Sequence, residues 1–139
     1  FLLPPSLNLA IAQRLVKKLC EECKKQVTAS PQVADIIEEG LNKLNLEKRE
    51  KTEWKKPYII YQAQGCKFCG QRGTKGRIAL FEIVKMTPEM EEIIIKNPTE
   101  SAIEKEAQRQ GMVTMKQDGV LKVLEGIISF EEMMKVVED

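Results

Sequence analysis

The cysteines constrain this chain more than any other feature. All four lie in two identical brackets, Cys20-x-x-Cys23 and Cys66-x-x-Cys69. A Cys-x-x-Cys turn presents two thiolates to one metal ion, and two such turns supply four tetrahedral ligands. Because the chain has no histidine, a closed site of cysteines and histidines can only be Cys₄ here. The spacing therefore predicts a structural metal site, with no position left open for a metal-bound water.

Zinc is the ion that this spacing favours, in a structural role. Iron also accepts four thiolates and stays as an alternative. Disulfides or redox-active thiols are a further alternative, with three possible disulfide connectivities. Nothing else in the chain suggests secretion, and reducing compartments disfavour disulfides.

The residues beside the cysteines are those a metal–thiolate centre needs. Gly70 follows Cys69 directly, and a glycine there lets the backbone turn so that amide N–H groups point at sulfur. Nearby lysines would offset the negative charge of a Zn(Cys)₄ centre: Lys18, Lys24, Lys25 and Lys67. Because structural zinc can supply on the order of 10 kcal/mol of apparent folding free energy, we expect residues 20–77 to depend on it.

Length and charge suggest two small lobes within 139 residues. Residues 14–77 hold 15 Lys/Arg and 8 Asp/Glu, whereas residues 78–139 hold 7 and 13. No apolar run approaches the roughly 18 residues needed to span a bilayer. Residues 1–5 lack both an initiator Met and a basic signal region, so we interpret the chain as a piece of a longer protein.

The first half is expected to mix helices with a β-hairpin. Ser6 is expected to cap a helix that ends near Leu19, because apolar residues cover most of its circumference. Ser30-Pro31 predicts a second helix, which ends near Leu44. Residues 58–62 and 77–84 have strand composition, and we expect them to pair as a small antiparallel hairpin with the metal at its tip.

From Thr87 onward the pattern is helical. Thr87-Pro88 and Thr99 begin two short helices, and two capping boxes begin two more. The boxes are Thr114-x-x-Gln117 and Ser129-x-x-Glu132, with Gly126 as the stop between them. The methionines of this region are expected to fill its core: Met112, Met115, Met133 and Met134. The predicted fold class is α+β, a Cys₄ zinc-knuckle lobe with a small hairpin plus a small C-terminal helical bundle.

Other features favour plain structural roles. Residues 45–57 are charged and predicted to form an exposed connector, in which Trp54 is a packing anchor. Gly70, Gly73 and Gly76 are expected to form a flexible connector, because no phosphate-loop string accompanies them. With no histidine and no nucleophile–base pair, we predict no catalytic residues and no nucleotide-binding residues in this chain.

Four strings together resemble the C-terminal region of the bacterial type II secretion and type IV pilus assembly ATPases, the secretion ATPase superfamily. They occur in the family's order: Leu9-Ala-Ile-Ala-Gln-Arg-Leu-Val-Lys-Lys-Leu-Cys20, Gly65-Cys-Lys-Phe-Cys-Gly70, Gly73-Thr-Lys-Gly-Arg-Ile-Ala-Leu-Phe-Glu-Ile83, and Gly111-Met-Val-Thr-Met-Lys-Gln-Asp-Gly119 continuing to Lys122-Val-Leu-Glu-Gly-Ile127.

The resemblance implies a homo-hexameric motor at the cytoplasmic face of the inner membrane. Its RecA-like core would bind ATP and Mg²⁺ outside this chain and would work with an inner-membrane platform protein. Residues 1–19 would be the terminal helix at the edge of that core, 20–85 the tetracysteine lobe and 86–139 a helical lobe. Only Cys20, Cys23, Cys66 and Cys69 carry a family role, as metal ligands; Arg14 receives no nucleotide role.

A zinc-ribbon module that binds nucleic acid is the alternative function. Paired knuckles on a hairpin and the basic first half favour it. The acidic second half and the lack of knuckle aromatics other than Phe68 disfavour it, because single-stranded nucleic acid needs stacking platforms. The first interpretation expects no direct nucleic-acid partner.

Overall fold

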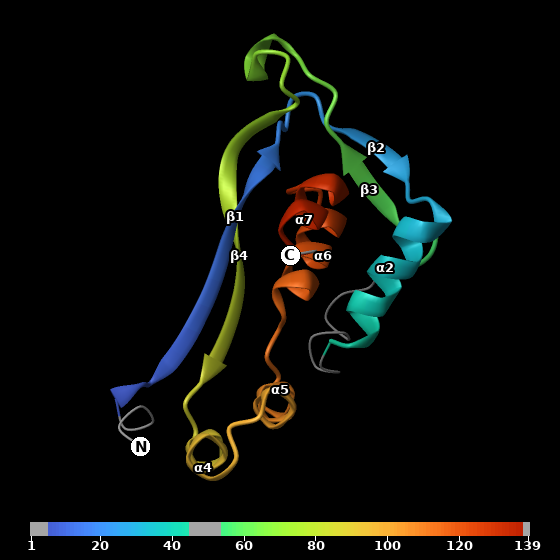
Figure 1. The fold of residues 1–139 in the computed structure, drawn as a ribbon. Coiled ribbons are helices and arrows are strands. Elements are labelled where there is room, and N and C mark those ends of the chain that lie inside the picture. Colours follow the sequence, from blue (N-terminus) through green and yellow to red (C-terminus); the bar gives the residue numbers. More distant parts are fainter. Residues whose placement is uncertain (1–5, 45–53, 138–139) are drawn as a thin grey trace.

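The fold is built from two separate β-ribbons and a set of short helices (Figure 1). The computed structural model describes residues 6–44 and 54–137. The strands are β1 (Leu9–Leu19), β2 (Lys25–Thr28), β3 (Ile59–Gln62) and β4 (Thr74–Lys85). The helices are α2 (Pro31–Asn42), the 3₁₀ helix η1 (Lys67–Cys69), α4 (Pro88–Lys96), α5 (Glu100–Arg109), α6 (Met115–Leu124) and α7 (Phe130–Val137). The predicted α+β class is confirmed.

The chain crosses between the two ribbons twice, at the same place. β1 pairs antiparallel with β4, and β2 pairs antiparallel with β3. The connection from β1 to β2 and the connection from β3 to β4 therefore both pass from one ribbon to the other. These connections contain the two Cys-x-x-Cys brackets, at the upper end of Figure 1. The topology thus brings both brackets to one junction.

The predicted N-terminal helix is wrong, because residues 9–19 form strand β1. Leucine, alanine, glutamine, arginine and lysine favour helix locally, but the long strand β4 supplies an antiparallel partner from Leu9↔Lys85 to Leu19↔Thr74. A segment that is apolar on most sides fits a two-sided apolar strand as well as a buried helix. Long-range pairing decided between the two.

The predicted hairpin is also wrong in its pairing, although both of its strands exist. Residues 59–62 and 74–85 are strands, but β3 pairs with β2 and β4 pairs with β1. The knuckle between β3 and β4 is a crossover and not a hairpin turn. Local sequence could not reveal this, because the partner strands β1 and β2 lie far away in the chain.

Side-chain caps begin the helices where the sequence predicted them. The hydroxyl groups of Ser30, Thr87 and Thr99 each accept a hydrogen bond from the amide three residues on. Thr114 and Gln117 form the complete predicted capping box of α6. Ser129 accepts from the amide of Glu132 at 3.3 Å at the start of α7. The second predicted box is formed only in this half, because the Glu132 carboxylate accepts a hydrogen bond from the Lys17 amide. Local capping thus favours all these helix starts.

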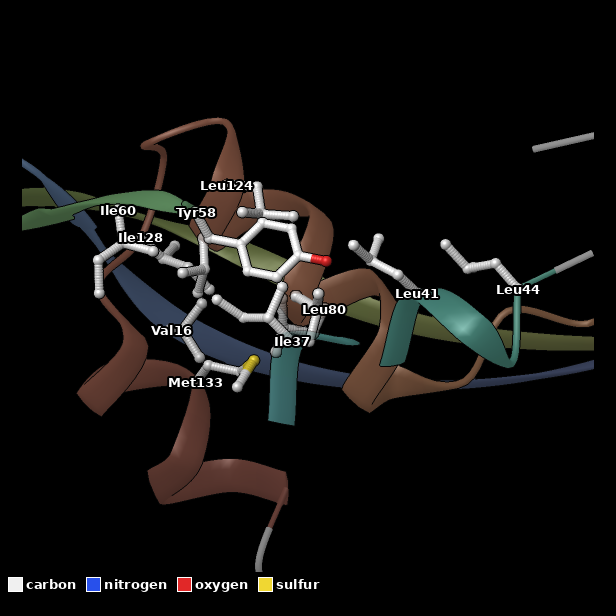
Figure 2. Packing of buried hydrophobic residues seen from close by; sticks show 12 residues of the cluster. Val16, Ile37, Leu41, Leu44, Tyr58, Ile60, Leu80, Leu124, Ile128 and Met133 are labelled. Carbon is white, nitrogen blue, oxygen red and sulfur yellow. The ribbon is translucent and has the colours of Figure 1, made fainter. Parts of the chain in front are cut away.

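One buried cluster lies between the ribbons and joins both halves of the sequence. Figure 2 shows Ile37 from α2, Leu80 from β4, and Leu124, Ile128 and Met133 from the α6–α7 region packed together. Ile37, Leu80, Ile128 and Met133 have no exposed surface. Helices α6 and α7 lie between the ribbons, where they contact β1, β3 and β4 (Figure 1). As predicted, Met133 fills this core.

The predicted connector is described only in part. Residues 45–53 lie outside the described residues, so its exposure there is not tested. Trp54 is half-buried and packs against the cluster, which confirms its predicted packing role. Across residues 6–44 and 54–137, no helix is both long enough and apolar enough to cross a membrane.

Candidate metal centre

The structure brings all four cysteine sulfurs together. The four Sγ atoms lie within 4.8 Å of one another. The Sγ–Sγ distances are 3.8 Å for Cys66 and Cys69, 3.9 Å for Cys23 and Cys69, and 4.0 Å for Cys20 and Cys66. Sulfurs bound at about 2.3 Å to a central tetrahedral ion would be about 3.8 Å apart. The donor set and its spacing therefore fit a four-coordinate Zn²⁺.

Each cysteine pair lies on a tight, hydrogen-bonded turn. In the first knuckle the amides of Cys23 and Lys24 donate to the carbonyl of Cys20 at 3.2 and 2.9 Å. In the second, η1 ends at Gly70, whose left-handed φ of 62° suits glycine. The amide of Cys20 also donates to the carbonyl of Gly73 at 3.0 Å. The two knuckles are thus connected through the backbone as well as through sulfur.

Backbone amides point at one of the sulfurs. The N–H groups of Cys66 and Gly73 both donate to the Cys69 Sγ at 3.2 Å. The left-handed Gly70 turns the backbone as the sequence predicts, while its own amide donates to the Lys67 carbonyl. Gly73 is not predicted from the sequence as a hydrogen-bond donor to sulfur. The one sequence feature that could indicate this role is its position four residues after Cys69. Such N–H···S bonds orient a thiolate and stabilise its charge.

Two of the thiols have pKa values shifted in opposite directions. Burial raises the pKa of Cys69, but the amides of Cys66 and Gly73 outweigh it and lower that pKa to about 6. The pKa of Cys23 is raised to about 12, chiefly by burial. A hydrogen bond from the Gly65 backbone lowers this pKa, whereas hydrogen bonds with the other three thiols raise it. One sulfur is therefore prepared as a thiolate, whereas a metal would have to displace the proton of the other.

The basic residues near the centre have specific partners. Arg72 Nε donates to the Cys69 carbonyl at 3.0 Å, and Lys75 Nζ lies 3.4 Å from the ring centroid of Phe68. Lys24 Nζ bonds to Glu21 and to a carbonyl of the α6–α7 loop. Of the four lysines predicted to offset the centre's charge, Lys24 is thus bound to a carboxylate. Arg72, which the sequence placed only in a flexible loop, contacts the second knuckle.

Comparisons with known proteins establish the class. Residues 1–135 match the family described as Type II/IV secretion system protein. This chain belongs to that family, and the family resemblance seen in the sequence is confirmed.

Three relatives are similar along nearly the whole chain. It is 34% identical over 139 residues to the type IV pilus assembly ATPase PilB of Pseudomonas aeruginosa, covering 100% of this chain and 22% of the relative. It is 34% identical over 137 residues to the protein transport protein HofB homolog of Escherichia coli K12, and the match covers 99% of this chain and 26% of the relative. It is 32% identical over 139 residues to the type II secretion system ATPase E of Vibrio cholerae, and the match covers 100% of this chain and 25% of the relative. The chain therefore spans about a quarter of each relative.

Proposed function

We propose that this chain is the metal-binding and helical part of a hexameric ATPase that drives type IV pilus assembly or type II protein secretion. The observation that carries the proposal is the family match over residues 1–135. ATP and Mg²⁺ would bind to a RecA-like core outside this chain. The partners would be that core and an inner-membrane platform protein, at the cytoplasmic face of the inner membrane. The described residues would transmit motion and would not perform catalysis.

The metal would be a structural Zn²⁺ held by Cys20, Cys23, Cys66 and Cys69. Four sulfurs at tetrahedral spacing leave no open position, so the ion would supply cohesion and no reaction chemistry. Because each cysteine pair lies on a different crossover, one ion would join all four strands at a single point. We propose that this makes the junction rigid. It would then move with the motor core as one body.

The surface that would attach to the motor core is one face of the β1–β4 ribbon. The register places Leu9, Ile11 and Leu15 of β1 on the same face as Phe81 and Ile83 of β4. These side chains are 45, 55, 61, 41 and 46% exposed, in that order. An exposed apolar face of this extent is typical of a buried interface. In the described part of the chain the sheet has only two strands, so the outer edge of β1 before Lys17 is open to a further strand. The amides of Lys17 and Leu19 are already bonded to Glu132 and to the carbonyl of Ile127.

This face replaces the predicted helix as the connection to the core. We propose that β1, not a terminal helix, forms the edge of the RecA-like core and that the sequence enters the tetracysteine lobe at Cys20. Residues 20–85 and 86–139 would remain the two lobes, and they share the buried cluster. Cys20 follows β1 directly, so motion of that strand would reach the metal without a linker.

Substitutions in the whole protein test the metal role. Cys69→Ser should abolish zinc binding and strongly reduce pilus assembly or secretion, while Gln71→Ser, an exposed residue beside the second knuckle, should leave both intact. Zinc content and secretion would be measured together. Normal secretion by a zinc-free variant would contradict the structural role.

Substitutions in the ribbon test the attachment surface separately. Ile11→Asp with Ile83→Asp should weaken hexamer formation and ATP hydrolysis, because both charges would enter the proposed interface. Ile59→Asp is the matched control, since Ile59 is 41% exposed on the other ribbon. An equal loss in the control, or no loss in the ribbon variant, would contradict this surface as the attachment.

The nucleic-acid alternative has one observation in its favour. Phe68 is 59% exposed at the second knuckle, and Lys75 lies over its ring. Single-stranded nucleic acid could stack on such a ring. If this were its function, binding of DNA or RNA would weaken steeply with salt and would be lost in Phe68→Ala.

A further inference from the structure

The loop between α6 and α7 is held by the two residues that flank the first knuckle. Leu19, directly before Cys20, donates its amide to the carbonyl of Ile127 at 2.9 Å. Lys24, directly after Cys23, donates from Nζ to the carbonyl of Gly126 at 2.9 Å. Two successive carbonyls of this loop are therefore bound from either side of one Cys-x-x-Cys bracket.

The position of Lys24 is fixed by the knuckle itself. Its amide donates to the carbonyl of Cys20 at 2.9 Å, so the backbone of Lys24 is part of the cysteine turn. Its ammonium group is 2.6 Å from Glu21 and 5.1 Å from the ring centroid of Tyr61. The side chain is only 19% exposed. A lysine with these partners has little freedom to leave the Gly126 carbonyl.

Gly126 directly follows the C-cap of α6 and has a left-handed backbone conformation. Its φ is +69°, and an added Cβ would lie 2.6 Å from Cδ2 of Tyr61. The amides of Gly126 and Ile127 donate back to the carbonyls of Val123 and Lys122 at 3.0 and 2.9 Å. A cation at the carboxyl end of a helix interacts favourably with the last carbonyls and with the helix dipole. Lys24, from another part of the chain, therefore places a positive charge at the carboxyl end of α6, on a carbonyl just beyond the helix.

We propose that Lys24 is a positioning residue that couples metal binding at the cysteines to the placement of the α6–α7 pair. The proposal rests on the proposed function, in which these cysteines hold zinc. Metal ligation closes the turn from Cys20 to Cys23, and the closed turn presents Lys24 to the α6 terminus. Without the metal the turn loosens, Lys24 leaves Gly126, and the end of α6 opens.

The coupling gives the metal centre an effect beyond its own ligands. Helices α6 and α7 contact β1, β3 and β4, so their placement affects both ribbons. The junction and the helix pair would then respond together to the metal. The ring of Tyr61, from β3, completes the connection by packing on Gly126.

Hydrogen exchange on the intact zinc-loaded protein tests this coupling. The amides of Gly126, Ile127 and Ile128 are the reporters, because they donate to carbonyls at the end of α6. Lys24→Met should retain zinc and accelerate exchange at these amides by about tenfold, since it removes a charged hydrogen bond. Lys25→Met, at the neighbouring exposed lysine, should change nothing, and Lys24→Arg should restore most of the protection.

Chelation provides the second arm of the experiment. Removing zinc from the wild type should accelerate the same amides. Removing it from Lys24→Met should accelerate them by a smaller factor, because the two changes share the Lys24 contact. Unchanged exchange in zinc-loaded Lys24→Met would overturn the coupling while leaving the zinc proposal intact. A wild type purified without bound zinc would overturn both.

Discussion

The metal junction and the buried cluster lie close together, yet they depend on different forces. Of the four cysteines at the junction, Cys20 and Cys69 are buried and Cys23 and Cys66 are half-buried, and the exposed Phe68 lies between Cys66 and Cys69. In the cluster, α2, α6, α7, β3 and β4 contribute side chains with almost no exposed surface. Burial can hold the cluster together, whereas the junction has too little apolar surface and would need ligation.

The junction and the cluster are therefore sensitive to different substitutions. Loss of a ligand acts on the crossovers and so on the connection between the ribbons. Loss of a core side chain acts on packing and should leave the sulfurs in place. The two regions would not be independent if loss of a ligand disrupted the cluster as much as the junction, or if loss of a core side chain released the metal.

Removal of the metal should have the largest effect. Structural zinc can contribute on the order of 10 kcal/mol, so chelation should lower the free energy of unfolding by several kcal/mol. Thermal unfolding of zinc-loaded and chelator-dialysed protein would measure this, with re-addition of zinc as the control. Identical melting temperatures would show that burial alone holds the junction.

A cavity in the cluster should come next. Ile37→Ala removes a side chain with no exposed surface and should cost about 2–5 kcal/mol, without loss of bound metal. Ile95→Ala, at a position 60% exposed, should change the free energy of unfolding by less than about 0.5 kcal/mol. Denaturant unfolding and elemental analysis together check both parts. Loss of zinc from the Ile37 variant would show that the two regions are not separable.

Loss of the N-terminal cap of α6 should lower the free energy of unfolding by a smaller amount. Thr114→Ala removes one half of the capping box with Gln117 and should cost about 1 kcal/mol. Thr114→Ser should keep most of the stability, because the serine hydroxyl can accept the same hydrogen bond from the Gln117 amide. Equal unfolding midpoints for the alanine variant and the wild type would contradict a role for this cap.

Glu106 should make a smaller contribution to the free energy of unfolding, and this contribution should be lost in acid. Hydrogen bonds from Arg109, then from Gln110, lower the pKa of this carboxyl from 4.5 to about 2. Its contribution to stability is therefore fully present above pH 4.5 and is lost as the pH falls towards 2. Glu106→Gln should flatten that part of the stability curve, and Glu100→Gln, an exposed residue on the same helix, should not. Parallel curves for wild type and Glu106→Gln would contradict this.

The sequence predicted what local chemistry decides. Ser30, Thr87 and Thr114 cap their helices because a hydroxyl and an amide three residues apart need no distant partner. The two brackets met as predicted, since metal-ligand spacing indicates which cysteines belong together.

What the sequence could not predict depends on distant pairing. The segment from Leu9 to Leu19 has helix-favouring residues, and only its antiparallel contact with β4 makes it a strand. The link from Lys24 to Gly126 joins residues 102 positions apart and carries no local signal. Gly73 was missed as a sulfur donor because its role depends on the folded loop.

We propose above that one tetrahedral ion joins both crossovers. X-ray absorption spectroscopy at the zinc edge of the intact protein tests it most directly. We expect one zinc per chain with four sulfur neighbours at about 2.3 Å. Protein without zinc, or zinc with nitrogen or oxygen ligands in place of any of the four sulfurs, would contradict it.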